Sequence, residues 1–221
     1  MIATLSADIV RSTSLTTDDL IDLRNRLLNF FDDLEKDYQG FWARIVRGDS
    51  VECFMPEYRC ALRIAVLVKL FVKIRASVYN CSEMMQKYGI RFSIGMGELK
   101  YVSKNDDIID GPAIYLSGRN LNAISHSGDS FSIIEMDGAP RSLNCFVDSY
   151  IAMISNMVDS YSAKQAEVVF YKLLGFKERE ISDRLGIFQS SVNTRSSKAQ
   201  WGLLNTAIKD FENMKFEGLC G

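Results

Sequence analysis

Two aspartates lie at the ends of segments that are typical of β-strands. Asp8 follows the largely apolar segment 1–7, and Asp49 lies in segment 45–54, which has the pattern of a strand, a tight turn and a strand. Strand ends and hairpin turns expose side chains at the edge of a rigid sheet, so two such carboxylates could share Mg²⁺ or Mn²⁺ and, with it, a triphosphate. The alternative is that both are turn formers, because Asp and Gly favour hairpin loops for conformational reasons.

Four motifs follow one another along the chain in an informative order. They are Asp-Ile-x-x-Ser-Thr from Asp8, Gly-Asp-x-x-x-x-Phe from Gly48, Ile-Gly-x-Gly-Glu from Ile94 and Gly-x-x-Ile-x-x-x-x-Arg from Gly111. This order resembles the catalytic domain of class III nucleotidyl cyclases, over residues 1–136. The resemblance implies an α+β domain with a ferredoxin-like βαββαβ sheet, metal ions at Asp8 and Asp49, and ATP or GTP as ligand.

The same resemblance assigns positions to the nucleotide. Arg119 stands where the family's arginine steadies the charge that develops on the phosphates, a role that suits the planar, forked guanidinium. Arg119 is therefore the candidate catalytic residue if the domain is active. The nucleotide-binding positions that the resemblance implies are Ser12, Thr13, Gly48 and Arg119.

Three positions depart from the family's pattern. Tyr115 stands in place of the Asn that orients the ribose, and a phenol lacks the paired donor and acceptor of an amide. The base-selecting Lys and Asp fall at Ile45 and Ile108, although Asp107 and Asp110 lie close to the latter. Losing one transition-state contact lowers the rate by about a hundredfold or more. We expect a degenerate domain that binds nucleotide without turnover. The alternative is a domain with a purely structural or protein-interaction role.

Three helices are predicted in the C-terminal region. Ser162 is a favourable N-cap for the first, because apolar residues follow it at helical spacing. The second is predicted over residues 177–185. After a brief turn, we expect Ser190 or Ser191 to cap a third, longer helix that continues through Ala207.

The second and third of these helices have the spacing of a helix-turn-helix. Ile181 and Val192 would pack the two together, Ser182 is small enough for a close crossing, and Gly186 allows a left-handed turn. The region resembles the C-terminal DNA-binding modules of sigma factors and of response regulators. The alternative is a helical hairpin that serves in dimerisation.

The third helix would present side chains that can bond base edges and phosphates. These are Gln189, Ser190, Ser191, Asn193, Thr194, Arg195 and Lys198. No Asp or Glu occurs from residue 186 through 207, so phosphate would meet no carboxylate there. The resemblance therefore implies double-stranded DNA as a partner.

Charge sets a limit on this interaction. Residues 162–221 carry 9 Lys or Arg against 7 Asp or Glu, and the whole chain has a formal net charge of -2. Such a weak local excess of positive charge predicts weak binding by one copy. Useful affinity would need a homodimer that reads two half-sites, and cyclase-like domains commonly pair head to tail.

Several other classes are disfavoured. The 5 Cys show no Cys-x-x-Cys spacing, and His126, the single histidine, is given no role, so zinc and disulfide scaffolds are not expected. The most apolar stretch, residues 60–74, is interrupted by three charged residues and predicts a core helix rather than a membrane span. The first apolar run is interrupted by Asp8, so we expect no export signal and a cytoplasmic location.

The elements that must position these residues follow from periodicity and turn signals. Strands are predicted at 1–8, 41–47, 50–55, 90–100 and 130–136, with helices at 17–38, 58–76 and 112–125 and a polar loop at 103–110. The expected organisation is a cyclase-like domain over 1–138, a connecting helix over 139–160 and an all-α helix-turn-helix domain over 161–221.

Together these patterns predict a bacterial-type, DNA-binding transcriptional regulator with a degenerate, nucleotide- and Mg-sensing N-terminal domain. This layout is similar to that of the SatD-like proteins. An active cyclase that converts a nucleoside triphosphate to a cyclic nucleotide is the alternative from another functional class. A third possibility is an adaptor that binds neither nucleotide nor DNA.

Overall fold

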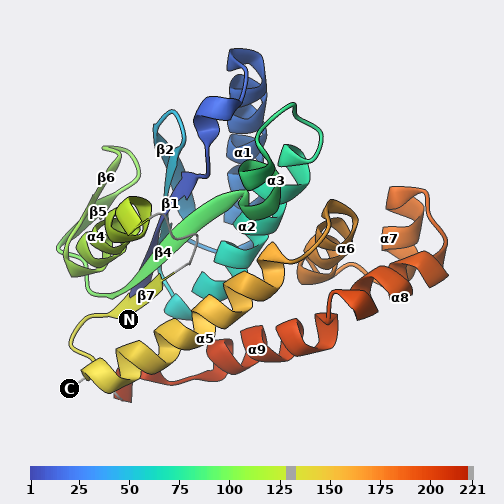
Figure 1. Cartoon of the computed structure of the whole chain (residues 1–221). Coiled ribbons are helices and arrows are strands. Elements are labelled where there is room, and N and C mark those ends of the chain that lie inside the picture. Colours follow the sequence, from blue (N-terminus) through green and yellow to red (C-terminus); the bar gives the residue numbers. More distant parts are fainter. Residues whose placement is uncertain (128–132, 219–221) are drawn as a thin grey trace.

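The computed structural model describes residues 1–127 and 133–218, and the side chain of His126 lies outside the described part. The chain has an α+β fold, as predicted, with a mixed five-stranded sheet in the order β2-β3-β1-β4-β7 (Figure 1). Its strands are β1 (Ile2–Ile9), β2 (Trp42–Arg47), β3 (Ser50–Met55), β4 (Ile90–Gly97) and β7 (Ile133–Met136). Neighbouring strands are antiparallel except for β4 and β7, which are parallel.

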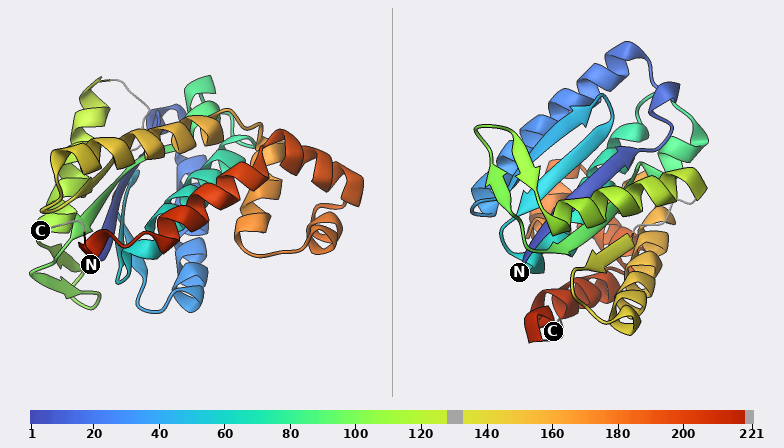
Figure 2. Two further views of the ribbon diagram at one scale, coloured as in Figure 1. Left: turned by 90° about the horizontal axis from the view of Figure 1, so that it is seen from below. Right: turned by 90° about the vertical axis from the view of Figure 1, so that its left-hand side faces the viewer.

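The strand period of two gives β1 an apolar face and a polar face. Ala3, Leu5 and Ala7 are fully buried in the main core, together with α1 (Thr17–Asp37) and α2 (Ala61–Ala76). On the opposite face, α4 (Pro112–Ser127) crosses the sheet, as the right-hand view of Figure 2 shows. The two sides of the sheet therefore differ in chemistry, with a hydrocarbon core on one side and hydroxyl groups on the other.

A short hairpin covers the rest of the polar face. It consists of β5 (Tyr101–Ser103) and β6 (Ile108–Asp110), which pair antiparallel. The polar loop predicted at 103–110 covers β6 and only the last residue of β5. Ile109 of the hairpin and Ile114 of α4 pack on Trp42 of β2. Apolar residues at the hairpin's base, which the loop prediction disregarded, therefore fix it to the sheet.

Six further helices complete the described part. They are α3 (Glu83–Tyr88), α5 (Arg141–Asp159), α6 (Ala163–Leu173), α7 (Glu178–Leu185), α8 (Gln189–Lys198) and α9 (Trp201–Asn213). Helix α5 lies beside α9 (Figures 1 and 2), where the Tyr150 hydroxyl donates to the Ala207 carbonyl at 2.6 Å. The ring of Phe170 on α6 lies 5.5 Å from that of Phe30 and 6.1 Å from that of Phe71. The C-terminal helices thus share a core with the sheet and α2.

The single long helix predicted from Ser190 or Ser191 through Ala207 is wrong. Helix α8 begins after the N-cap Phe188, and Gln200 adopts a left-handed conformation, φ 53 and ψ 40, that separates α8 from α9. The break redirects the chain so that Leu204 and Ile208 of α9 are fully buried in the main core. Tertiary burial therefore outweighs the local preference for a continuous helix.

Candidate functional site

The structure brings Asp8 and Asp49 together at one edge of the sheet. Asp8 lies near the end of β1, opposite Ser50 of β3 and Arg91 of β4. Asp49 lies in the turn between β2 and β3, and its backbone carbonyl accepts a hydrogen bond from the Ile9 amide at 3.1 Å. A β-hairpin packed against β1 therefore places both carboxylates within electrostatic reach of each other, as the strand pattern predicted.

Arg91 is the principal partner of Asp8. Its Nη2 and Nε lie 2.7 and 3.2 Å from Asp8 Oδ2. Burial raises the pKa of Asp8, Arg91 opposes that effect, and the negative charge of Asp49 raises the pKa further. The site is thus two acidic groups and one guanidinium rather than a bare pair of carboxylates.

The segment after β1 holds Asp49. Ser12 and Thr13 lie in the 3-10 turn Ser12–Ser14, where the Ser12 hydroxyl donates to Asp49 Oδ2 and Thr13 is exposed. Gly48 has a positive φ of 43°, and its carbonyl accepts from Arg24 Nη1 at 3.4 Å. Ser12 and Thr13 therefore lie in the turn that contacts Asp49, and Gly48 is its neighbour in the β2–β3 turn, next to Asp8 of β1.

The donor set fits a divalent cation only in part. Within residues 1–127 and 133–218, no group of three or more His, Cys, Asp or Glu side chains could hold a metal ion. Mg²⁺, however, is commonly bound by one or two carboxylates, with substrate phosphates and waters completing its octahedron. Both hydrogen bonds that Arg91 donates to Asp8 fall on Oδ2, which leaves Asp8 Oδ1 as the oxygen for a cation. The site thus fits a cation that arrives with a polyphosphate better than a cation alone.

Arg119 and Tyr115 are not joined to this edge by any contact in the described part of the chain. Both are exposed on α4, which packs on β4 and β1 through Ala113 and Ser117. The Tyr115 hydroxyl donates to Oδ1 of Asp110, the last residue of β6. Within the described part of one copy, therefore, Arg119 makes no direct contact with the two aspartates that it would have to assist.

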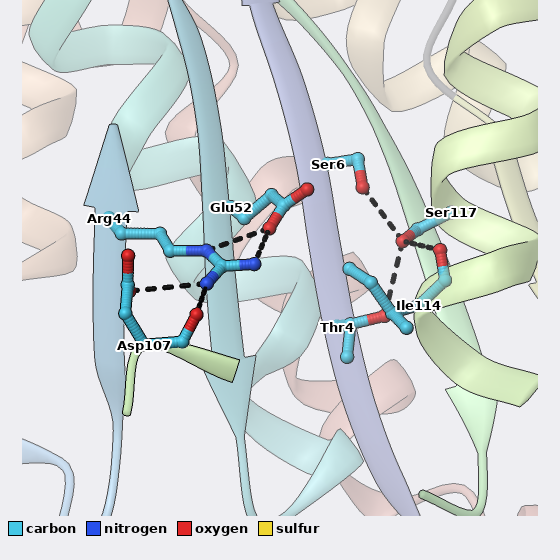
Figure 3. A network of polar contacts seen from close by, with 7 residues as sticks. All are labelled: Thr4, Ser6, Arg44, Glu52, Asp107, Ile114 and Ser117. Atoms are coloured by element: carbon cyan, nitrogen blue, oxygen red, sulfur yellow. Dashed lines mark hydrogen bonds and ion pairs between the residues drawn. The ribbon is translucent and has the colours of Figure 1, made fainter. Parts of the chain in front are cut away.

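The polar face of the sheet contains a second network, shown in Figure 3. Arg44 of β2 pairs with Glu52 at 2.6 Å on β3, and with Asp107 at 3.2 Å in the β5–β6 hairpin. Beside it, Ser117 of α4 lies 2.9 Å from the Ser6 hydroxyl and 3.2 Å from that of Thr4. Asp107 thus fixes the hairpin to the sheet, and Asp110 accepts from Tyr115, so both stand-ins for the base-selecting Asp are engaged within the chain.

Helices α6, α7 and α8 enclose a small core of their own. Val168, Ile181 and Val192, one from each helix, are fully buried against one another. Gly186 ends α7 in a left-handed conformation, φ 62 and ψ 36, and the Ser182 hydroxyl donates to the Ile187 carbonyl at 2.6 Å across the turn. Ile181 and Val192 therefore pack together and Gly186 is left-handed, as the sequence predicted.

The outer face of α8 is polar and open to solvent. Gln189, Ser190, Asn193, Thr194 and Lys198 are exposed, and Ser191 and Arg195 are partly exposed. Phe188, at the N-cap of α8, is 83 % exposed and so presents its ring to solvent. All seven residues named from the sequence thus reach solvent on one short helix, with an aromatic ring at its beginning.

Sequence reasoning missed Arg91 and Phe188. The strand period gave a signal for Arg91, because Arg91 and Ser93 alternate with the apolar residues Ile90, Phe92 and Ile94. That signal does not reveal which residue of β1 lies opposite, and the pairing of Arg91 with Asp8 depends on the register of β1 and β4. Phe188 gave no signal, because an apolar residue next to a turn is usually buried.

No family model, curated protein or solved structure matches the chain. Among the described residues, no helix combines the length and the apolar character needed to cross a bilayer. Function is therefore inferred from the geometry of the Asp8–Asp49 edge and of α8.

Proposed function

We propose that the chain is a DNA-binding transcriptional regulator in which α7 and α8 form a helix-turn-helix, with α8 as the recognition helix. One observation carries this proposal. The seven polar residues named from the sequence lie solvent-accessible on a helix that three buried residues, Val168, Ile181 and Val192, fix in place. A rigid helix with an open polar face and no carboxylate from residue 186 through 207 suits the major groove.

The N-terminal unit is the proposed sensor. Its strand order β2-β3-β1-β4 supports a ferredoxin-like, cyclase-type sheet, and the Asp8–Asp49 edge supports ATP or GTP with Mg²⁺ or Mn²⁺ as ligand. Asp8 and Asp49 would take the cation, while Arg91 and the Ser12–Thr13 turn would meet phosphate oxygens. The unit would sense nucleotide rather than convert it, because Tyr115 and the lack of a described contact between Arg119 and the two aspartates leave the reacting centre incomplete within one copy. Such a protein would work in the cytoplasm as a homodimer.

Binding of double-stranded DNA tests the regulator proposal directly. Fluorescence anisotropy with fragments selected from a random library should give saturable binding, whose affinity falls about tenfold or more when Arg195 and Lys198 are both changed to Ala. Lys209→Ala on α9 is the control, because it removes one positive charge from an exposed position outside α8. Binding that is equal in all variants, or absent with every selected fragment, contradicts the proposal.

An active nucleotidyl cyclase is the second candidate, and the juxtaposition of Asp8 and Asp49 is the observation that favours it. It predicts cyclic nucleotide from ATP or GTP with Mn²⁺, lost in Asp49→Ala and increased in Tyr115→Asn, which restores an amide at the ribose position. Chromatographic analysis of the nucleotides decides between an active cyclase and a nucleotide sensor. If wild type and Tyr115→Asn are both inert while nucleotide still raises the melting temperature, the site is a sensor.

A further inference from the structure

A pocket of about 500 Å³ lies where the C-terminal helices meet the sheet unit. Its walls come from α2, α3, the turn between α5 and α6, and the first turn of α6. The residues that bear on its chemistry are Lys73, Glu83, Lys87, Asp159, Tyr161 and Ala163. Neither the Asp8–Asp49 edge nor the outer face of α8 contributes to it.

Lys73 is a buried cation in the pocket wall, only 2 % exposed. Its Nζ donates to the Lys87 carbonyl and, at 3.0 Å, to the Asp159 carbonyl. An ammonium group has three protons to donate. Since these two acceptors are its hydrogen-bond partners in the described chain, one proton remains for a ligand.

Tyr161 lines the same pocket and is 5 % exposed. Its buried hydroxyl has no hydrogen-bond partner among the described residues. Burying a hydroxyl without a partner is unfavourable, and such groups usually bond water or a ligand. The unpartnered hydroxyl is thus a second, independent indication that a polar group belongs here.

The first turn of α6 adds backbone donors. The Ser162 side chain accepts from the Gln165 amide at 3.3 Å. Ala163, which lines the pocket, comes before Gln165 in the first turn, where backbone N–H groups have no acceptor within the helix. The N-terminus of an α-helix favours anions, because its free N–H groups and its dipole both attract negative charge.

The two carboxylates in the wall do not cancel this preference. Asp159 is neutralised by Lys69, whose Nζ lies 2.8 Å from Asp159 Oδ1. Glu83 is a single carboxylate on α3 and, like Lys87, is exposed. Lys73 and Lys87 therefore leave an excess of positive charge and of hydrogen-bond donors around the pocket.

We propose that this pocket binds a small oxyanion, a phosphate or a carboxylate, through Lys73, Lys87, the Tyr161 hydroxyl and the first turn of α6. The proposal is independent of nucleotide binding at Asp8 and Asp49. Because the walls belong to α2 and α3 on one side and to α6 on the other, a bound anion would strengthen the contact between the sheet unit and the helices that lead to α8.

Isothermal titration calorimetry of the full chain with inorganic phosphate, and separately with acetate, tests this site. Ionic strength is held constant with chloride, so that only specific binding gives a saturable signal. At least one of the two anions should bind, and the affinity should fall about tenfold or more in Tyr161→Phe and in Lys87→Met. Lys209→Met, exposed on α9 and outside the pocket, should keep the wild-type affinity.

Tyr161→Phe separates a ligand site from a structural role. Phe fills the same volume and removes only the unpartnered hydroxyl, so the variant should melt at the same or a higher temperature while it loses affinity for the anion. The proposal is overturned if neither anion gives saturable heat, or if Tyr161→Phe and Lys87→Met bind as tightly as wild type. Phosphate bound in those variants would be held elsewhere, for example by Arg91.

Discussion

Lys69 of α2, which is fully buried, lies 2.8 Å from Asp159 at the end of α5. The same Nζ donates to the carbonyls of Tyr88 and Ile90 at 3.1 and 2.9 Å. Burial raises the pKa of Asp159, and the positive charges of Lys69 and Lys73 oppose that effect. One ammonium group therefore joins α2, the beginning of β4 and the end of α5.

Removing this cation should destabilise the protein strongly. Lys69→Met leaves Asp159 buried without its closest counter-charge, which typically costs about 3–5 kcal/mol. Lys36→Met is the control, because Lys36 and Asp33 form a solvent-exposed pair, which contributes little to stability. Urea denaturation of both variants measures the difference. Equal midpoints for the two variants would mean that the buried pair adds nothing.

Lys73 should make stability depend on pH above neutrality. Burial lowers its pKa from 10.5 to about 8 in the folded chain. Between these two values the unfolded chain binds the proton more tightly, so the free energy of unfolding should rise with pH, by about 1–3 kcal/mol. Urea denaturation across this range should show a rise in wild type that is absent in Lys73→Met. If the free energy of unfolding rises equally in wild type and in Lys73→Met, a titrating group other than Lys73 causes the pH dependence.

Gly95 of β4 should be essential for the packing of α4. A Cβ at this position would lie 2.0 Å from the Ala113 carbonyl oxygen, and backbone atoms cannot move away as a flexible side chain could. Gly95→Ala should therefore cost about 3 kcal/mol or prevent folding. Gly118→Ala on α4 is a matched control, because no atom lies within 4 Å of its added Cβ. It should be neutral or stabilising by up to about 1 kcal/mol, since Ala favours helices. Similar melting temperatures for the two variants would refute this account.

Arg91 should have opposite effects on a free metal ion and on a nucleotide. Arg91→Met removes the cation next to Asp8, so Mg²⁺ or Mn²⁺ alone should bind more tightly. The same change removes a guanidinium that could meet phosphate, so ATP or GTP with Mg²⁺ should bind more weakly. Thermal shift titrations with each ligand separate these effects, and Arg141→Met, exposed at the beginning of α5, is the control. Weaker binding of both ligands would indicate that Arg91 only maintains the fold.

Phe188 should contribute to DNA recognition if α8 enters the major groove. Its ring is 83 % exposed at the beginning of α8, where it could contact the methyl group of thymine. Phe188→Ala should weaken binding to a selected fragment by about tenfold, and replacing thymine by deoxyuridine should then have no further effect. The wild-type chain should bind the deoxyuridine fragment more weakly. If the variant stays sensitive to deoxyuridine, another residue reads the methyl group.

Local sequence was sufficient for much of the fold. The largely apolar run before Asp8 predicted β1, and the serine before residue 163 predicted the beginning of α6, where Ser162 accepts from Gln165. Gly186 was predicted to allow a left-handed turn and has a φ of 62°. Such features depend on residues only a few positions apart, so their physical cause is contained in a short segment. Asp8 and Asp49 belong to this class, because a strand end and a hairpin turn were enough to place them at a sheet edge.

Tertiary structure decided the features that depend on distant segments. Arg91 lies against Asp8 because of the register between β1 and β4, and Lys69 meets Asp159 because α5 returns to α2. Gln200 separates α8 from α9 because burial of Leu204 requires the chain to change direction there. Strand register, ion pairs between distant elements and helix breaks of this kind are set by packing free energy, which periodicity along the sequence does not encode.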